Sequence, residues 1–232
     1  MRAILCATLL AGLLLTSKWS GLEFAEGHGG GGAQASTSDS KPTVYVSDFE
    51  IDVAPKSAGA DNRPPSGLRF AAQQPGGQNP EEETRKRASQ LVDWMSTKVM
   101  AALQKAGYPA VRMHRGDARP EKGVQIRGLF AEVDSENHWR RAVIHSADDA
   151  GKMQALVAVA NLSKPEQVLY EVAQMPGNEP GPGAVITLSP YVPLTKFDVS
   201  KDAKEDVFQK IAPRIVDGLT ALLNANPAAV SQ

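Results

Sequence analysis

The sequence predicts an α+β domain, in which a mixed sheet of about five to seven strands is covered on one face by two amphipathic helices. The stretch Gly123–Ser163 carries three strand patterns joined by short polar links, and we expect it to form the centre of the sheet. Helix-period apolar stripes occur at Asn79–Ala106 and at Asp202–Asn224. A chain of 232 residues is long enough for one well-buried domain, which we place at residues 42–224.

The strands are predicted from the alternation of apolar and polar residues. Within Pro42–Val53 the parity of the apolar residues switches, which predicts a bulge or bend near Ser47 and Asp48. Gly128 interrupts a strand pattern and predicts the close approach of a neighbouring element. Pro165–Met175 fits a helix or a strand, and its alternation favours a strand. The predicted strands are Pro42–Val53, Tyr108–His114, Gly123–Asp134, Trp139–Ser146, Lys152–Ser163, Pro165–Met175 and Gly183–Pro190.

The two helical stripes carry their own start and stop signals. Asn79 is predicted to cap the first helix, and Gly107 to end it in the left-handed conformation. Asp202 and Glu205 have the spacing of a capping pair for the second helix. Pro213 lies inside that second stripe, so we expect the helix to be kinked or split near Gln209.

Two features of the first helix concern its surface. The basic cluster Arg85–Arg87 follows the acidic cluster Glu81–Glu83 by four residues, which favours ion pairs on a solvated face over a phosphate-binding patch. Trp94 lies off the apolar stripe, so it marks either a contact surface or packing against the preceding loop.

The N-terminus predicts export. Arg2 is followed by an apolar run that ends at Lys18, before the roughly 20 residues needed to span a bilayer. Residues 1–20 are therefore predicted to be a signal peptide or a retained N-terminal anchor, which would be the protein's only membrane contact. We expect the protein in the periplasm or cell envelope.

The segments outside the strands and helices are predicted from composition. Residues 21–41 are rich in Gly and Ser, which predicts a flexible tether. Residues 54–78 are rich in Pro, Gly, Ala and Gln, which predicts a long loop within the domain. Residues 225–232 are predicted to be a frayed tail.

Charge and cysteine content exclude several classes of protein. The formal net charge is −1, and loss of residues 1–20 would leave 23 basic and 26 acidic residues. A slightly acidic domain lacks the positive surface of a nucleic-acid binder, so we predict no nucleic-acid partner. The one cysteine, Cys6, lies in the N-terminal apolar run, so the mature domain would have neither a disulfide nor a Cys-ligated metal.

Motifs for catalysis are missing from the sequence. It contains no G-x-S-x-G, P-loop or H-E-x-x-H pattern. His138 and His145 are separated by an odd spacing, so they would face opposite sides of a regular strand and could share a metal only across a break. Asp134 and Glu136, with His138, offer an acid and a base, but polar turn residues are the expected role. We predict no enzyme activity, no cofactor and no metal.

A candidate binding surface lies around the second central strand. The arginines beside Trp139 suit an aromatic or carboxylate ligand, although a solvated strand end is favoured. The turn that follows adds polar residues to the same surface. The candidate binding surface comprises Trp139, Arg140, Arg141, His145, Asp148 and Asp149.

Three stretches, VYVSDFEID, RGLFAEVDSENHWRRAVI and KMQALVAVANLS, resemble a bacterial exported family described as domain of unknown function 4410. That family has an early V-x-V-x-D-F strand and a stretch of the form F-x-x-V-D-x-G-x-x-x-x-R. Phe130, Val133, Asp134 and Arg141 fall on its patterned positions. The resemblance covers roughly residues 42–223. It fails at His145–Gly151, where HSADDAG stands in place of the family's G-F-G-A-G.

The resemblance implies export and the fold, because the family has no established activity. At fold level the layout is similar to periplasmic modules of the curli-secretion lipoprotein and TolB N-terminal kind, which implies action through protein contacts. We therefore expect a non-catalytic protein-interaction or assembly module, with another envelope protein or a second copy as partner. The alternative is a small-molecule or glycan-binding module that uses Trp139, Arg140, Arg141 and His145.

Overall fold

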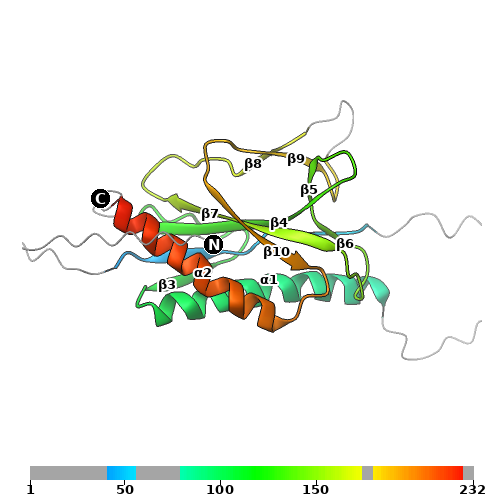
Figure 1. Ribbon diagram of the computed structural model, residues 1–232, viewed down its shortest axis with the longest axis horizontal. Helices are drawn as coiled ribbons and strands as arrows, with labels where there is room; N and C mark the ends of the chain where they lie inside the picture. The colour runs from blue at the N-terminus through cyan, green and yellow to red at the C-terminus, as the bar shows by residue number, and fades with distance from the viewer. Residues whose placement is uncertain (1–40, 56–78, 174–179, 227–232) are drawn as a thin grey trace, which may run out of the picture. The chain divides into compact units, whose positions relative to one another are not determined.

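The computed structural model describes residues 41–55, 79–173 and 180–226 (Figure 1). Residues 1–20, the tether up to residue 40, most of the loop at 54–78 and the tail from residue 227 lie outside the described residues. The predictions for those segments therefore stay predictions.

The fold class is α+β, as predicted. In the described part of the chain, the elements are β1 (Val44–Ser47), β2 (Asp52–Val53), α1 (Pro80–Lys105), β3 (Ala110–Met113), β4 (Val124–Val133), β5 (Trp139–Arg141), β6 (Val143–Ile144), β7 (Lys152–Asn161), β8 (Tyr170–Val172), β9 (Val185–Leu188), β10 (Leu194–Ser200) and α2 (Glu205–Ala225). In the described part of the predicted strand Pro165–Met175, only β8 is a strand. No helix among the described residues is long and apolar enough to cross a membrane.

The strand β4 lies at the centre of the sheet, as predicted from the three strand patterns within Gly123–Ser163. Its antiparallel partner β7 runs along one side, from the pair Val124 and Asn161 to the pair Ala131 and Gln154. The other side is shared, since β1 pairs in parallel with the start of β4 and β5 pairs antiparallel with its end. The path β10-β7-β4-β5-β9-β8, with β1 and β3 attached, makes one mixed sheet of eight described strands.

Two strand predictions need correction. The strand β10 was not predicted; it is an edge strand whose buried residues Phe197 and Val199 alternate with charged ones, so its apolar signal is short. The single strand predicted at Trp139–Ser146 is broken at Ala142. Its second part, β6, leaves the large sheet and pairs in parallel with β2, because the Asp52 N–H donates to the Ala142 carbonyl.

The main core lies between one face of the sheet and both helices (Figure 1). Phe130 of β4 meets Phe208 of α2 edge-on, with ring centroids 6.4 Å apart. Trp94 also packs against Phe208, at 6.2 Å, so it lies in the contact between the helices, whereas its predicted packing against the preceding loop falls largely outside the described residues. The apolar stripes thus cover one face of the sheet, as predicted.

The opposite face of the sheet carries a smaller apolar cluster. The strands β5, β9 and β8 continue the sheet and curl over this face, on the side away from the helices (Figure 1). The buried members of this cluster are Leu129, Ala131, Leu156, Ala158, Leu169, Ile186 and Val192. Both faces of β4 are therefore buried, although by different elements.

The ends of α1 follow the sequence signals. The Asn79 side chain accepts a hydrogen bond from the Glu81 N–H at 3.2 Å, and Gly107 has φ +79°. Arg85 pairs with Glu81 at 2.7 Å, as predicted. Arg87 does not join this solvated face. Its guanidinium donates instead to the carbonyl oxygens of Lys201 and Ala203, just before α2.

The start of α2 differs from the prediction. The helix is capped at Lys204 without a side-chain hydrogen bond, so Asp202 lies outside it and the predicted capping pair is wrong. Asp202 accepts a hydrogen bond from the Ser200 hydroxyl instead. The helix is one continuous element through Pro213, because buried residues on both sides of the proline pack against the sheet. The prediction of a split near Gln209 is therefore wrong.

Replacing Gly218 by alanine is expected to raise the free energy of unfolding by about 1 kcal/mol. Gly218 lies inside α2, and a methyl group there would meet no atom within 4 Å. Alanine would therefore restrict the unfolded chain without strain in the helix. A thermal melt should show a rise of about 2–4 °C, and an unchanged or lower melting temperature would contradict the helical geometry at this position.

Candidate functional site

The residues Asp48 and Phe49 lie where the chain leaves β1, at the predicted bend. Asp48 Oδ1 accepts a hydrogen bond from Arg112 Nε at 2.7 Å, and Asp48 Oδ2 lies 2.9 Å from His114 Nδ1. Arg112 also donates to Asp93 of α1 at 2.6 Å. Burial alone lowers the pKa of Arg112, but the hydrogen bonds to Asp93 and Asp48 raise it above its ordinary value. Asp48 thus ties the ends of β1 and β3 to α1.

The Phe49 ring covers Gly128 of β4, which confirms the predicted close approach at that glycine. The ring is 3% exposed and lies 5.7 Å, centroid to centroid, from Phe130. Phe49 thus fills the place that a side chain at position 128 would occupy. The V-x-V-x-D-F stretch therefore supplies a polar contact from its aspartate and a core contact from its phenylalanine.

A groove of about 770 Å³ runs past the ends of β1 and β3 and is lined by charged side chains. On one wall, Glu166 bridges Arg119 at 3.0 Å and Arg127 at 2.8 Å. Glu50, which also lines the groove, accepts a hydrogen bond from the Tyr170 hydroxyl at 2.5 Å. Burial and this hydrogen bond raise the pKa of Tyr170. The charged residues that line this groove, here called the end groove, are Asp48, Glu50, Asp52, Arg85, Asp93, Arg112, Arg115, Asp117, Arg119, Arg127, Arg141 and Glu166.

The arginines of the predicted binding surface contact different partners. Arg140 Nε donates to Asp134 Oδ2 at 2.6 Å, whereas Arg141 Nε lies 3.0 Å from Asp52 Oδ2. The pKa of Arg141 is raised, because Tyr170 and Asp52 outweigh the opposing effect of burial. The Trp139 ring faces the Lys196 ammonium at 4.4 Å.

The turn His145–Gly151 is held from inside by Asp149. One carboxylate oxygen of Asp149 accepts from the His145 N–H at 3.2 Å, and the other accepts from the Gly151 N–H at 3.0 Å. Lys201 Nζ lies 3.4 Å from the same carboxylate. Burial alone would raise the pKa of Asp149, but these amides and Lys201 lower it below its ordinary range.

Lys201 is a buried charged residue with several polar partners, and the sequence did not predict it as part of a site. It is 4% exposed, and its ammonium reaches the Val143 carbonyl at 2.7 Å and Glu132 at 3.0 Å as well as Asp149. A buried lysine needs such partners, because an unpaired charge in the interior is costly. No local sequence signal marks it, since its three partners come from β4, β6 and the turn before β7.

The six residues of the predicted binding surface do not meet in one site. Arg141 lines the end groove, whereas His145 and Asp148 line a different hollow beside the start of α1. Arg140 and Asp149 are engaged in turns, and Trp139 packs at the edge of the smaller apolar cluster. A single ligand contacting all six residues has no support in this arrangement.

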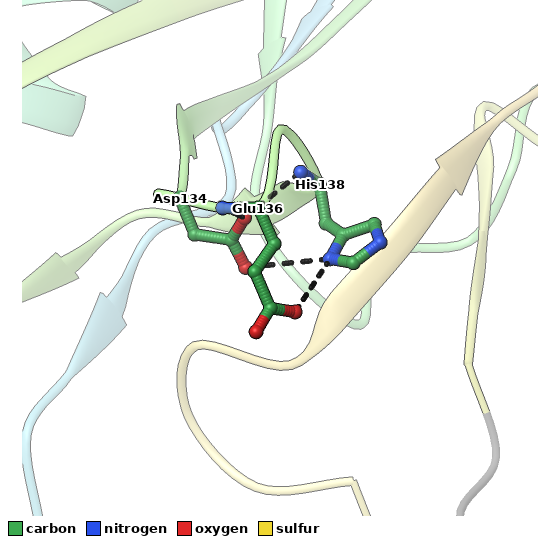
Figure 2. A group of neighbouring side chains, drawn as sticks. All are labelled: Asp134, Glu136 and His138. Carbon is green, nitrogen blue, oxygen red and sulfur yellow. Dashed lines mark hydrogen bonds and ion pairs between the residues drawn. The ribbon is translucent and has the colours of Figure 1, made fainter.

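The three residues Asp134, Glu136 and His138 do meet, at the turn between β4 and β5 (Figure 2). His138 Nδ1 lies 3.6 Å from Asp134 and 3.5 Å from Glu136. Asp134 Oδ1 already accepts from the backbone N–H groups of Glu136 and His138, each at 2.9 Å. With Arg140 on its other oxygen, the Asp134 carboxylate stabilises the turn and has little remaining capacity for a cation.

Asp134 should make the free energy of unfolding depend on pH between pH 3.8 and about pH 2. The backbone N–H of His138 and the Arg140 guanidinium lower the pKa of Asp134 from 3.8 to about 2. The stabilisation from this carboxylate is therefore complete above pH 3.8 and is lost as the pH falls towards 2. An Asp134→Asn variant should be less stable than wild type at neutral pH, with a difference that shrinks in this acid range. Unfolding curves whose difference stays constant down to pH 2 would contradict this role.

Comparison with known families gives one result. A family model, Domain of unknown function (DUF4410), matches residues 44–193. The chain belongs to the DUF4410 family. Searches of curated proteins and of solved structures find no match for this DUF4410 chain. The predicted family resemblance is thus confirmed, while the likeness to curli-secretion and TolB modules stays a prediction. The matched range of the DUF4410 model ends before β10 and α2.

The patterned residues of this DUF4410 chain mostly hold the fold. Phe130 lies in the core, Asp134 organises a turn, and Arg141 pairs with Asp52. Val133 is the exception, because it is 45% exposed. Three of the four patterned residues in this chain therefore contribute to the fold.

Proposed function

We propose that this protein is an exported, non-catalytic module that binds another envelope protein or a second copy of itself. The observation that carries the proposal is an apolar surface beside β8. Tyr191 is 81% exposed and Val168 is 59% exposed. Both line a hollow of about 350 Å³, together with Leu188 and Pro190. Exposed apolar and aromatic side chains around a hollow are typical of protein contacts. We call this region the β8 surface.

The backbone of β8 adds hydrogen-bonding groups to this surface. The Leu169 carbonyl and the Ala173 N–H bond to β9, which places the peptide groups of Tyr170 and Val172 on the outer side of the strand. Among the described strands, β8 is the last of its path in the sheet. An outer edge of this kind suits an extended segment of a partner.

The non-catalytic part of the proposal is supported by how the charged residues are used. Asp134 and Asp149 each hold a turn through two backbone N–H groups. Lys201 is closed in by three oxygen atoms. Groups bound in this way contribute to the stability of turns rather than to an open reaction site. The export part rests on the apolar N-terminal run, and fractionation of cells that produce the full chain would test it.

The test is site-specific photo-crosslinking in an envelope fraction. A photoreactive phenylalanine analogue placed at Tyr191 should capture one reproducible partner, or a second copy of the chain. The same analogue at Asp217, an exposed position on α2, serves as the matched control and should not capture that partner. Recovery of free monomer alone at position 191, or the same products from both positions, would contradict the proposal.

A further inference from the structure

Unpaired polar atoms are concentrated at the end groove. In the described part of the chain, the buried side-chain atoms without a hydrogen-bond partner are Gln125 Oε1, Arg127 Nε, Arg141 Nε and Gln154 Oε1. Three of these atoms belong to residues that line the end groove, but Arg141 Nε has Asp52 Oδ2 at 3.0 Å as an ion-pair partner, so Gln125 Oε1 and Arg127 Nε are the two left unpaired there. Buried polar groups are normally paired, so two unpaired ones in the same groove indicate a missing polar partner.

The floor of the groove offers both kinds of hydrogen-bonding atom. Gln125 and Arg127 occupy alternate positions of β4, so their side chains lie on the same face of the sheet. Gln125 is 7% exposed, and its amide nitrogen donates to the Ser47 hydroxyl at 2.8 Å, which leaves Oε1 as an unpaired acceptor. Arg127 is anchored through its terminal nitrogens to Glu166 and to the Gln167 carbonyl, which leaves Nε as an unpaired donor.

The charge of the groove limits the class of ligand. Its described lining contains six arginines and six carboxylates, so its formal net charge is zero with His114 neutral. An anion would meet the carboxylates, and a cation would meet the guanidinium groups. A hydroxyl group is uncharged and both donates and accepts, as Gln125 Oε1 and Arg127 Nε require. From these observations we propose that the end groove binds a neutral, hydroxyl-rich ligand, namely a glycan chain.

Access to these atoms requires a small movement of the groove wall. Gln125 Oε1 and Arg127 Nε are both buried in the free protein. Glu166, which pairs with Arg127, is 56% exposed, and an ion pair this exposed is easily exchanged for another partner. A volume of about 770 Å³ is in the range of sites that enclose a small ligand. The end groove shares no lining residue with the hollow of the β8 surface, so a ligand bound there goes beyond the proposed protein contact.

The test uses defined oligosaccharides and isothermal calorimetry with the folded protein. Chitotetraose and cellotetraose are the neutral glycan probes, tetragalacturonate is the anionic probe, and tetra-alanine is a neutral peptide probe. At least one neutral glycan should bind saturably, and more tightly than the other two probes. Gln125→Leu should weaken that binding roughly five- to tenfold, the effect of one hydrogen bond. Gln154→Leu removes the unpaired oxygen that lies outside the groove and should leave the affinity within about twofold.

A second readout does not depend on the stability of a variant. The Arg127 Nε–H group gives its own NMR signal, which an Arg127→Lys variant assigns, and this signal should shift when the glycan is added to wild type. Absence of binding by both neutral glycans would overturn the proposal. Preferential binding of tetragalacturonate or of tetra-alanine would also overturn it, and the second result would assign the groove to a protein partner. Equal weakening by Gln125→Leu and Gln154→Leu would place the glycan elsewhere.

Discussion

A Gly128→Ala variant is expected to lose about 3 kcal/mol of unfolding free energy, because the new methyl group has no room. An added Cβ would lie 2.1 Å from Cε1 and 2.5 Å from Cδ1 of Phe49. Phe49 cannot move aside freely, since it is 3% exposed and packs against Phe130. The bend that carries Asp48 and Phe49 would have to shift away from β4. Chemical denaturation, compared with wild type, measures this loss.

A matched control and a double variant sharpen this test. Gly181→Ala should change stability by less than about 0.5 kcal/mol, because a Cβ there would meet nothing within 4 Å. Adding Phe49→Leu to Gly128→Ala should cost less than the sum of the two separate changes, since the smaller side chain relieves the clash. A Gly128→Ala protein as stable as wild type would show that Phe49 does not cover this glycine.

Lys201→Met should destabilise the domain by about 3 kcal/mol, which corresponds to a fall in melting temperature of roughly 6–12 °C. Methionine fills a similar volume but leaves Glu132, Asp149 and the Val143 carbonyl without their common donor. Glu132 and Asp149 are only 26% and 15% exposed, so water replaces the ammonium poorly. The effect should be largest in the turn before β7, which hydrogen exchange would detect as faster exchange of the His145 and Gly151 amides.

The control for this variant is an exposed lysine with an ordinary ion pair. Lys210 pairs with Asp206 at 3.2 Å on the surface of α2, where its side chain is 78% exposed. Lys210→Met should therefore change stability by less than about 0.5 kcal/mol. Similar effects of the two substitutions would show that the ammonium of Lys201 is not an essential partner of these oxygens.

The secondary structure could be predicted where the spacing of apolar residues agrees with the residues that cap the helix ends. Asn79 and Gly107 bound α1 as expected, and the long central strands β4 and β7 lie within the segments predicted for them. Asp202 has the spacing of a cap, but the helix begins after Lys204, and spacing alone does not reveal where a helix begins. The edge strand β10 was missed because one charged face left only two buried residues as a signal.

The side-chain contacts could be predicted far less well. Arg87, Asp149 and Lys201 look like ordinary surface residues in the sequence, yet each bonds to groups distant in the chain or holds a turn. Arg140 and Arg141 are neighbours in sequence but face different partners, because side chains alternate along a strand. The end groove was not predicted, since its lining comes from α1, several strands and the loops between them.

The most direct test of the proposed protein contact is a Val168→Ser/Tyr191→Ser double variant in the full chain. Both side chains are mostly exposed, so the variant should unfold at the same denaturant concentration as wild type. Chemical crosslinking in the envelope fraction should yield the wild-type partner from the wild-type chain and lose it from the variant. A variant that is equally stable and still recovers that partner in full would contradict the assignment of the β8 surface as the site of contact.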